Sequence, residues 1–124
     1  MKDKRPVNLD IGTIQLPLAA LTSITHRISG IIVFVGIAFL LKLFDKSLSS
    51  QEGFNALQIY AQFTIVKFGL WAILSALAYH MVAGIKHLIM EMGVGETKEG
   101  SFVGAAITIV ISLILIASLG VWIW

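Results

Sequence analysis

Residues 100–124, GSFVGAAITIVISLILIASLGVWIW, contain no charged side chain, and this stretch decides the fold class. A helix needs roughly 20 apolar residues to cross a hydrocarbon core about 30 Å thick. The stretch meets this requirement without help from its neighbours. We therefore predict a transmembrane helix over about 101–124.

A second apolar segment precedes it. Residues 68–85 carry no formal charge, although His80 lies in the middle, and the helical pattern extends over about 63–89. The intervening residues 91–100, EMGVGETKEG, are rich in glycine and charge and predict a short connection. Short connections make sequential helices antiparallel.

The first apolar segment is less clean. Only fourteen residues separate Arg27 from Lys42, and they cover about 21 Å at 1.5 Å per residue, which is too little for a span. The helix must begin near residue 21, so we predict a span of about 21–44 that carries His26 and Arg27 inside its first turns. An arginine at that depth is costly unless it is paired or faces water or a ligand.

The composition agrees with an integral membrane protein. Of 124 residues, 57% are hydrophobic and 13% are charged, whereas a soluble domain is usually about a quarter charged. The absence of cysteine excludes a disulfide framework, and a net charge of +2 does not suggest nucleic acid. We predict an all-α fold: one membrane-anchor domain over residues 1–124, with three transmembrane helices that form part of a heteromeric helical bundle.

The distribution of lysine and arginine predicts the orientation, because these residues favour the cytoplasmic side. With three spans, six of them fall on the side of the N-terminus: Lys2, Lys4, Arg5, Arg27, Lys86 and Lys98. Three fall on the other side: Lys42, Lys46 and Lys67. We expect the N-terminal segment 1–20 to be cytoplasmic. Residues 45–60 then form the outer connection, a polar loop with a short surface helix.

His80 admits two interpretations. An imidazole this deep in the membrane needs a partner, so it either hydrogen-bonds to a neighbouring helix or ligates a metal or haem iron. Small residues flank it at helical spacing, which suits close helix packing and also leaves room for a flat macrocycle. The residues on this stripe are Gly69, Ala72, Ala76, His80, Gly84 and His87.

The second axial ligand of such a haem is not evident within the chain. His87 lies seven residues beyond His80, about 10.5 Å along the helix axis. His26, about five residues from the inner end of its helix, is predicted to lie nearer in depth to His87 than to His80. We therefore expect the other ligand to come from a different subunit.

Further polar side chains collect at the same end of the bundle. Ser23, Arg27 and Gly30 share one face of the first helix at spacing i, i+4, i+7, with His26 and Ser29 beside it. Such a cluster can anchor lipid head groups. It can equally bind a haem propionate, which pairs with an arginine fork, or a quinone oxygen, which needs a hydroxyl or cationic donor.

Three motifs together resemble a known family. They are Arg5-Pro6-Val7-Asn8-Leu9, then Ser23-x-x-His26-Arg27-x-Ser29-Gly30, then His80-x-x-x-Gly84-Ile85-Lys86-His87. The chain resembles the cytochrome b556 membrane-anchor subunits of bacterial succinate dehydrogenase (complex II), most closely the enterobacterial type, over essentially its whole length. It departs from the family where Lys86-His87 and Glu91 stand for an arginine-histidine pair and an aspartate.

The resemblance implies specific roles for four residues. His80 is the expected axial ligand of haem b, with iron as the metal, and the second, smaller anchor subunit supplies the partner ligand. Ser23 and Arg27 match the ubiquinone-site serine and arginine. His26 and Arg27 match positions near the haem propionates.

The resemblance also implies a division of labour. Succinate oxidation belongs to a flavoprotein subunit with FAD and an iron–sulfur subunit with its clusters, both docked on the cytoplasmic face. This chain would anchor them in the bacterial inner membrane and form part of the site where ubiquinone is reduced. Two alternatives stay open: the anchor of a quinol:fumarate reductase, and a haem-free structural anchor.

Overall fold

The computed structural model describes Val7, Leu9, Asp10 and residues 12–124. Within these residues the chain forms helices and no strands. The helices are α1 (Leu18–Ser49), α2 (Gln51–Tyr60), α3 (Thr64–Glu91) and α4 (Lys98–Ile123). The three long helices are apolar and long enough to cross a membrane, whereas α2 is a short connecting helix. The protein is an all-α, multi-pass integral membrane protein.

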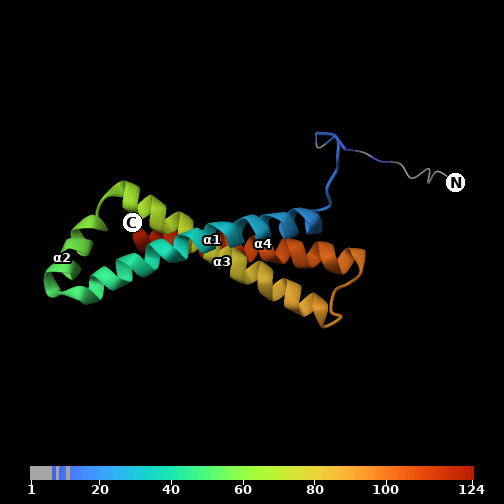
Figure 1. The fold of residues 1–124 in the computed structure, drawn as a ribbon. Coiled ribbons are helices and arrows are strands. Elements are labelled where there is room, and N and C mark those ends of the chain that lie inside the picture. Colours follow the sequence, from blue (N-terminus) through green and yellow to red (C-terminus); the bar gives the residue numbers. More distant parts are fainter. Residues whose placement is uncertain (1–6, 8, 11) are drawn as a thin grey trace.

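The long helices run side by side in alternating directions (Figure 1). The start of α1 and the α3–α4 connection lie at one end of the bundle, which we call the loop end. The C-terminus and α2 lie at the opposite end, which we call the α2 end. This arrangement is the one expected for three successive membrane crossings.

Each long helix starts or ends beyond its predicted span. With 32 residues, α1 is about 48 Å long, well over the roughly 30 Å of a hydrocarbon core. It stops at Ser49, and Ser50 caps α2 by accepting a hydrogen bond from the Gly53 amide, 2.9 Å away. Past α3, Gly93 adopts a φ of +84°, a conformation that glycine allows and that turns the chain toward α4.

Small residues line the interior of the bundle. The fully buried positions include Thr22, Ser29, Ala83, Ala105, Thr108 and Ser112, whereas isoleucine, leucine and phenylalanine side chains mostly face outward. The hydrophobic effect does not drive helices together inside a membrane, because lipid tails are as apolar as the side chains. Small residues favour helix association there because they allow the backbones to approach closely.

The contact between α1 and α3 depends on two glycines. A Cβ at Gly36 would lie 2.6 Å from Cγ2 of Ile73, and a Cβ at Gly30 would lie 3.0 Å from Cε1 of His80. These positions fix the antiparallel register of the two helices, because each glycine lies opposite a bulky side chain. The crossing brings His80 against the first helix.

An aromatic cluster closes the α2 end. Trp71 Nε1 donates a hydrogen bond to the Ile116 carbonyl, 2.9 Å away, which ties α3 to α4. The Trp124 ring lies 4.9 Å from the Phe68 ring and 6.1 Å from the Trp71 ring between centroids. Aromatic rings of this kind are enriched where a span meets the membrane–water interface.

Candidate functional site

The candidate site lies where α1 and α3 cross, and it centres on His80. His80 Nδ1 lies 3.1 Å from the backbone carbonyl oxygen of His26 and 3.1 Å from Oγ of Ser29. The Ser29 hydroxyl itself donates to the His26 carbonyl over 2.7 Å. Since that carbonyl can only accept, His80 carries its proton on Nδ1, and its Nε2 keeps a free lone pair.

His26 stacks on His80. Their ring centroids are 4.2 Å apart with an interplanar angle of 15°, and the His87 ring is 5.1 Å from His26 and tilted by 47°. Nε2 of His26 is buried, and no hydrogen-bond partner for it is found in the described part of the chain. An imidazole nitrogen in this condition has capacity to bind a further polar group.

The register of the crossing places His26 against the helix turn between His80 and His87. Its ring contacts both of their rings. Gly84 lies opposite His26, and a Cβ there would be 3.5 Å from Nε2 of His26. Gly84 is four residues from His80 and three from His87, which agrees with the predicted depth of His26. The stacked rings of His26 and His80 do not aim two nitrogens at one shared atom, as two axial ligands must.

A cavity of about 610 Å³ opens beside these rings. It brings together all four residues predicted from the sequence, Ser23, His26, Arg27 and His80, from two different helices. The rest of its lining comes from α3: Met81, Gly84, Ile85, His87 and Leu88. The Arg27 side chain is exposed, and Ser23 is half-buried. The cavity thus combines a hydroxyl, a guanidinium and three imidazoles with apolar walls.

Sequence reasoning missed the part played by Ser29. It noted only that Ser29 lies beside the polar face, whereas the structure buries it against His80. The signal was a serine three residues after a histidine, since such hydroxyls commonly bond back to a carbonyl one turn earlier. Lys86, in contrast, lines a different cavity, between α3 and α4. Part of the first family motif, Arg5, Pro6 and Asn8, lies outside the described residues.

Comparison with known proteins gives matches over the whole bundle. A family model described as succinate dehydrogenase/fumarate reductase transmembrane subunit matches residues 1–121. The succinate dehydrogenase cytochrome b556 subunit of Coxiella burnetii is 38% identical, with 100% of both chains covered.

More distant relatives carry the same name. The succinate dehydrogenase cytochrome b556 subunit of Paracoccus denitrificans is 27% identical, over 92% of this chain and 93% of the relative. That of Rickettsia felis is 29% identical, over 91% of this chain and 88% of the relative. All three alignments extend across the helices that build the cavity.

Proposed function

This chain belongs to the succinate dehydrogenase/fumarate reductase transmembrane subunit family, and from that premise we propose that it is the haem b-binding membrane anchor of a succinate:ubiquinone oxidoreductase. It would hold a flavoprotein and an iron–sulfur subunit at the membrane and pass their electrons to ubiquinone. The observation that carries this proposal is the hydrogen-bonded Nδ1 of His80, which leaves Nε2 free for iron beside the cavity.

The residues at the crossing fit a haem. Metal-ligating histidines almost always donate their other ring N–H to a carbonyl or carboxylate, as His80 can do to the His26 carbonyl. Gly30 and Gly84 remove the side chains that would crowd a flat ring. The buried, unpartnered Nε2 of His26 and the Arg27 guanidinium, both at the cavity, are suited to propionate oxygens. When bound, haem b supplies one-electron storage near the quinone.

The positions of the other two histidines support a second anchor subunit. His26 is stacked on His80 instead of opposing it, and His87 contacts His26. A six-coordinate haem would take its other axial ligand from the neighbouring anchor chain. The haem would then help to join the two subunits.

The ubiquinone pocket would use Ser23 and Arg27. Both line the cavity, one turn apart on α1, toward the loop end. The Ser23 hydroxyl would donate a hydrogen bond to a quinone carbonyl. Arg27 would stabilise negative charge that develops on the ring during reduction, because charge-assisted hydrogen bonds are roughly twice as strong as neutral ones.

The absorbance spectrum of the purified complex tests the haem proposal. We expect a low-spin b-type spectrum that His80→Ala perturbs or abolishes, because the axial nitrogen is lost. His87→Ala is the matched control on the same face of α3, and it should leave the bis-histidine spectrum intact. A wild-type complex without b-type absorbance would favour the haem-free anchor instead, and loss of the spectrum in His87→Ala alone would move the ligand from His80 to His87.

A further inference from the structure

Lys86 is a buried cation to which the proposed function assigns no role. It lies on α3 and is only 9% exposed. No ion pair or hydrogen bond to its ammonium is found among the described residues. Its aliphatic stem packs on α4, where a Cβ at Gly104 would lie 3.7 Å from Cε of Lys86. Its ammonium nitrogen is not among the buried polar atoms without a partner, so the charge stays accessible from the cavity and can pair with an anion there.

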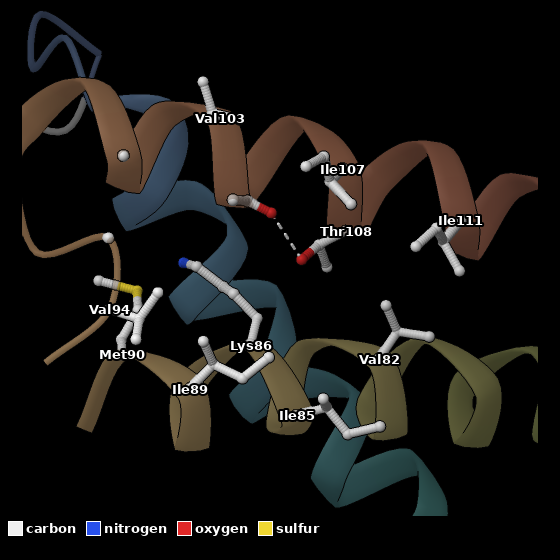
Figure 2. A pocket seen from close by; sticks show the side chains of 13 residues that line it. Val82, Ile85, Lys86, Ile89, Met90, Val94, Val103, Ile107, Thr108 and Ile111 are labelled. Atoms are coloured by element: carbon white, nitrogen blue, oxygen red, sulfur yellow. Dashed lines mark hydrogen bonds between the residues drawn. The ribbon is translucent and has the colours of Figure 1, made fainter. Parts of the chain in front are cut away.

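A second cavity surrounds this side chain. It has a volume of about 430 Å³, within the range of ligand pockets, and lies between α3 and α4. Figure 2 shows Lys86 extending from α3 into the space between the helices, with its nitrogen toward the α3–α4 connection. The walls are hydrocarbon, chiefly Val82, Ile85, Ile89, Val103, Ile107 and Ile111. Of the described residues that line it, Lys86 alone is charged.

The cavity is distinct from the histidine site. Lys86 follows His80 by six residues, which places it about 120° around α3 at roughly 100° per residue. Thr108, on its far wall, belongs to α4, a helix that contributes nothing to the cavity at His80. The two cavities thus lie on different sides of α3 and share only Ile85 among the described residues that line them.

We propose that this cavity binds one anionic phospholipid. Its phosphate lies at Nζ of Lys86, and one acyl chain runs along the isoleucine and valine walls between α3 and α4. The pairing supplies a counter-charge and covers apolar surface with hydrocarbon in one step. Basic pockets between transmembrane helices are known to take anionic head groups.

The depth of Lys86 favours a phospholipid as the occupant. Lys86 lies five residues before the end of α3, about 7.5 Å along the axis, and its nitrogen points back toward the loop end. Lysine side chains near helix ends reach the interface in this way. The described residues that line the cavity come from α3, α4 and the connection between them, so these walls form within one chain.

Lipid titration by native mass spectrometry tests the proposal. The protein is purified in its assembled complex, stripped of lipid with detergent, and titrated with phosphatidylglycerol or with phosphatidylethanolamine of the same acyl chains. We expect the first complement of phosphatidylglycerol to bind about tenfold more tightly than phosphatidylethanolamine, a difference of about 1.4 kcal/mol. Both lipids carry a phosphate, but the ammonium of ethanolamine offsets its charge and repels Lys86. Lys86→Met should abolish that preference, and Lys86→Arg should keep it.

Two further variants control for folding and for general surface charge. Lys42→Met removes an exposed lysine outside the cavity and should leave the preference unchanged. Ile107→Trp keeps Lys86 but fills the cavity from the α4 wall, and it should weaken phosphatidylglycerol binding.

Three results would overturn the assignment. Equal binding of the two phospholipids to the wild-type complex would show that the cavity does not select an anionic head group. An unchanged preference in Lys86→Met would place the lipid elsewhere, for example because a partner subunit fills the cavity. Displacement of phosphatidylglycerol by an equal concentration of oleate would show that the cavity binds free fatty acids instead of a phospholipid.

Discussion

At the scale of single residues, one backbone carbonyl governs the chemistry of His80. The His26 carbonyl accepts from Nδ1 of His80, and the Ser29 hydroxyl donates to the same carbonyl. The need for a partner at His80 could be predicted from the sequence, because a buried imidazole in a membrane must be satisfied. The identity of that partner could not, because it depends on the register between two helices more than fifty residues apart.

Ser29 offers a test of this arrangement. Ser29→Ala keeps the carbonyl but removes the hydroxyl that orients it, so haem should be held less tightly. Supporting residues of this kind typically change metal affinity by about 10–100-fold, and we expect the lower end because the carbonyl remains. The rate of haem transfer to apomyoglobin measures the change. Ser47→Ala is the matched control, since Ser47 also bonds back three residues, to Phe44; equal transfer rates in the two variants would contradict a positioning role for Ser29.

Replacing Ser23 and replacing Arg27 should slow quinone reduction to different extents. Loss of one neutral hydrogen bond costs about 0.5–1.5 kcal/mol and loss of one to a charged group about 1.5–3 kcal/mol. Ser23→Ala should lower ubiquinone turnover, and Arg27→Leu should lower it further. Succinate oxidation with a soluble artificial acceptor is the control and should survive both changes. Unchanged ubiquinone turnover in a fully assembled Arg27→Leu complex would leave Arg27 as a propionate or head-group anchor.

At the scale of helices, the register between α1 and α3 positions the whole site. Gly30 and Gly36 lie opposite His80 and Ile73, and this close approach places His26 between His80 and His87. Sequence reasoning recognised the small-residue stripe on the second span but could not determine which residues of the first span it meets. The stripe shows which face is close-packed, whereas the offset along the axis depends on which glycine meets which side chain.

Gly36 should be the most sensitive position in this contact. In Gly36→Ala the new methyl would lie 2.6 Å from Ile73, whose branched side chain cannot easily turn away, so we expect a loss of about 1–3 kcal/mol of stability. Gly69→Ala is the control, because its added methyl would meet no described atom within 4 Å apart from its chain neighbours and the nearby backbone of its own helix. Thermal unfolding of the detergent-solubilised complex measures both. A Gly36→Ala protein as stable as Gly69→Ala would show that α1 and α3 adjust their spacing freely.

At the scale of the whole molecule, the bundle places its small residues inside and its large apolar residues outside. The three spans were predictable because length and hydropathy determine which segments can cross a bilayer. The short helix α2 also falls within the connection 45–60, where a short surface helix was predicted. The overlong α1 was not predictable, since helices continue past the hydrocarbon region until a cap or glycine stops them. We propose that the loop end faces the cytoplasm, on the side that carries Arg27, Lys86 and Lys98.

Cysteine labelling tests this orientation, because the natural sequence contains no cysteine that would give background. Glu96→Cys, at the loop end, should be protected in intact spheroplasts from a maleimide that cannot cross membranes. Gln51→Cys, at the α2 end, should react. Both positions are exposed, so a detergent-permeabilised sample should label equally at the two sites. The reverse pattern in intact spheroplasts would invert the proposed topology.

The aromatic cluster has an optical consequence. All three tryptophans of the chain belong to the α2 end, far from the histidines at the helix crossing. Tryptophan emission from this chain therefore originates from one end of the bundle. Trp122 is 77% exposed, whereas Trp71 is half-buried and hydrogen-bonded. Trp124, 55% exposed, lies against Trp71 at the same end. The three indoles thus range from one that faces the surroundings to one that lies between two helices, and replacing them one at a time would separate their emission.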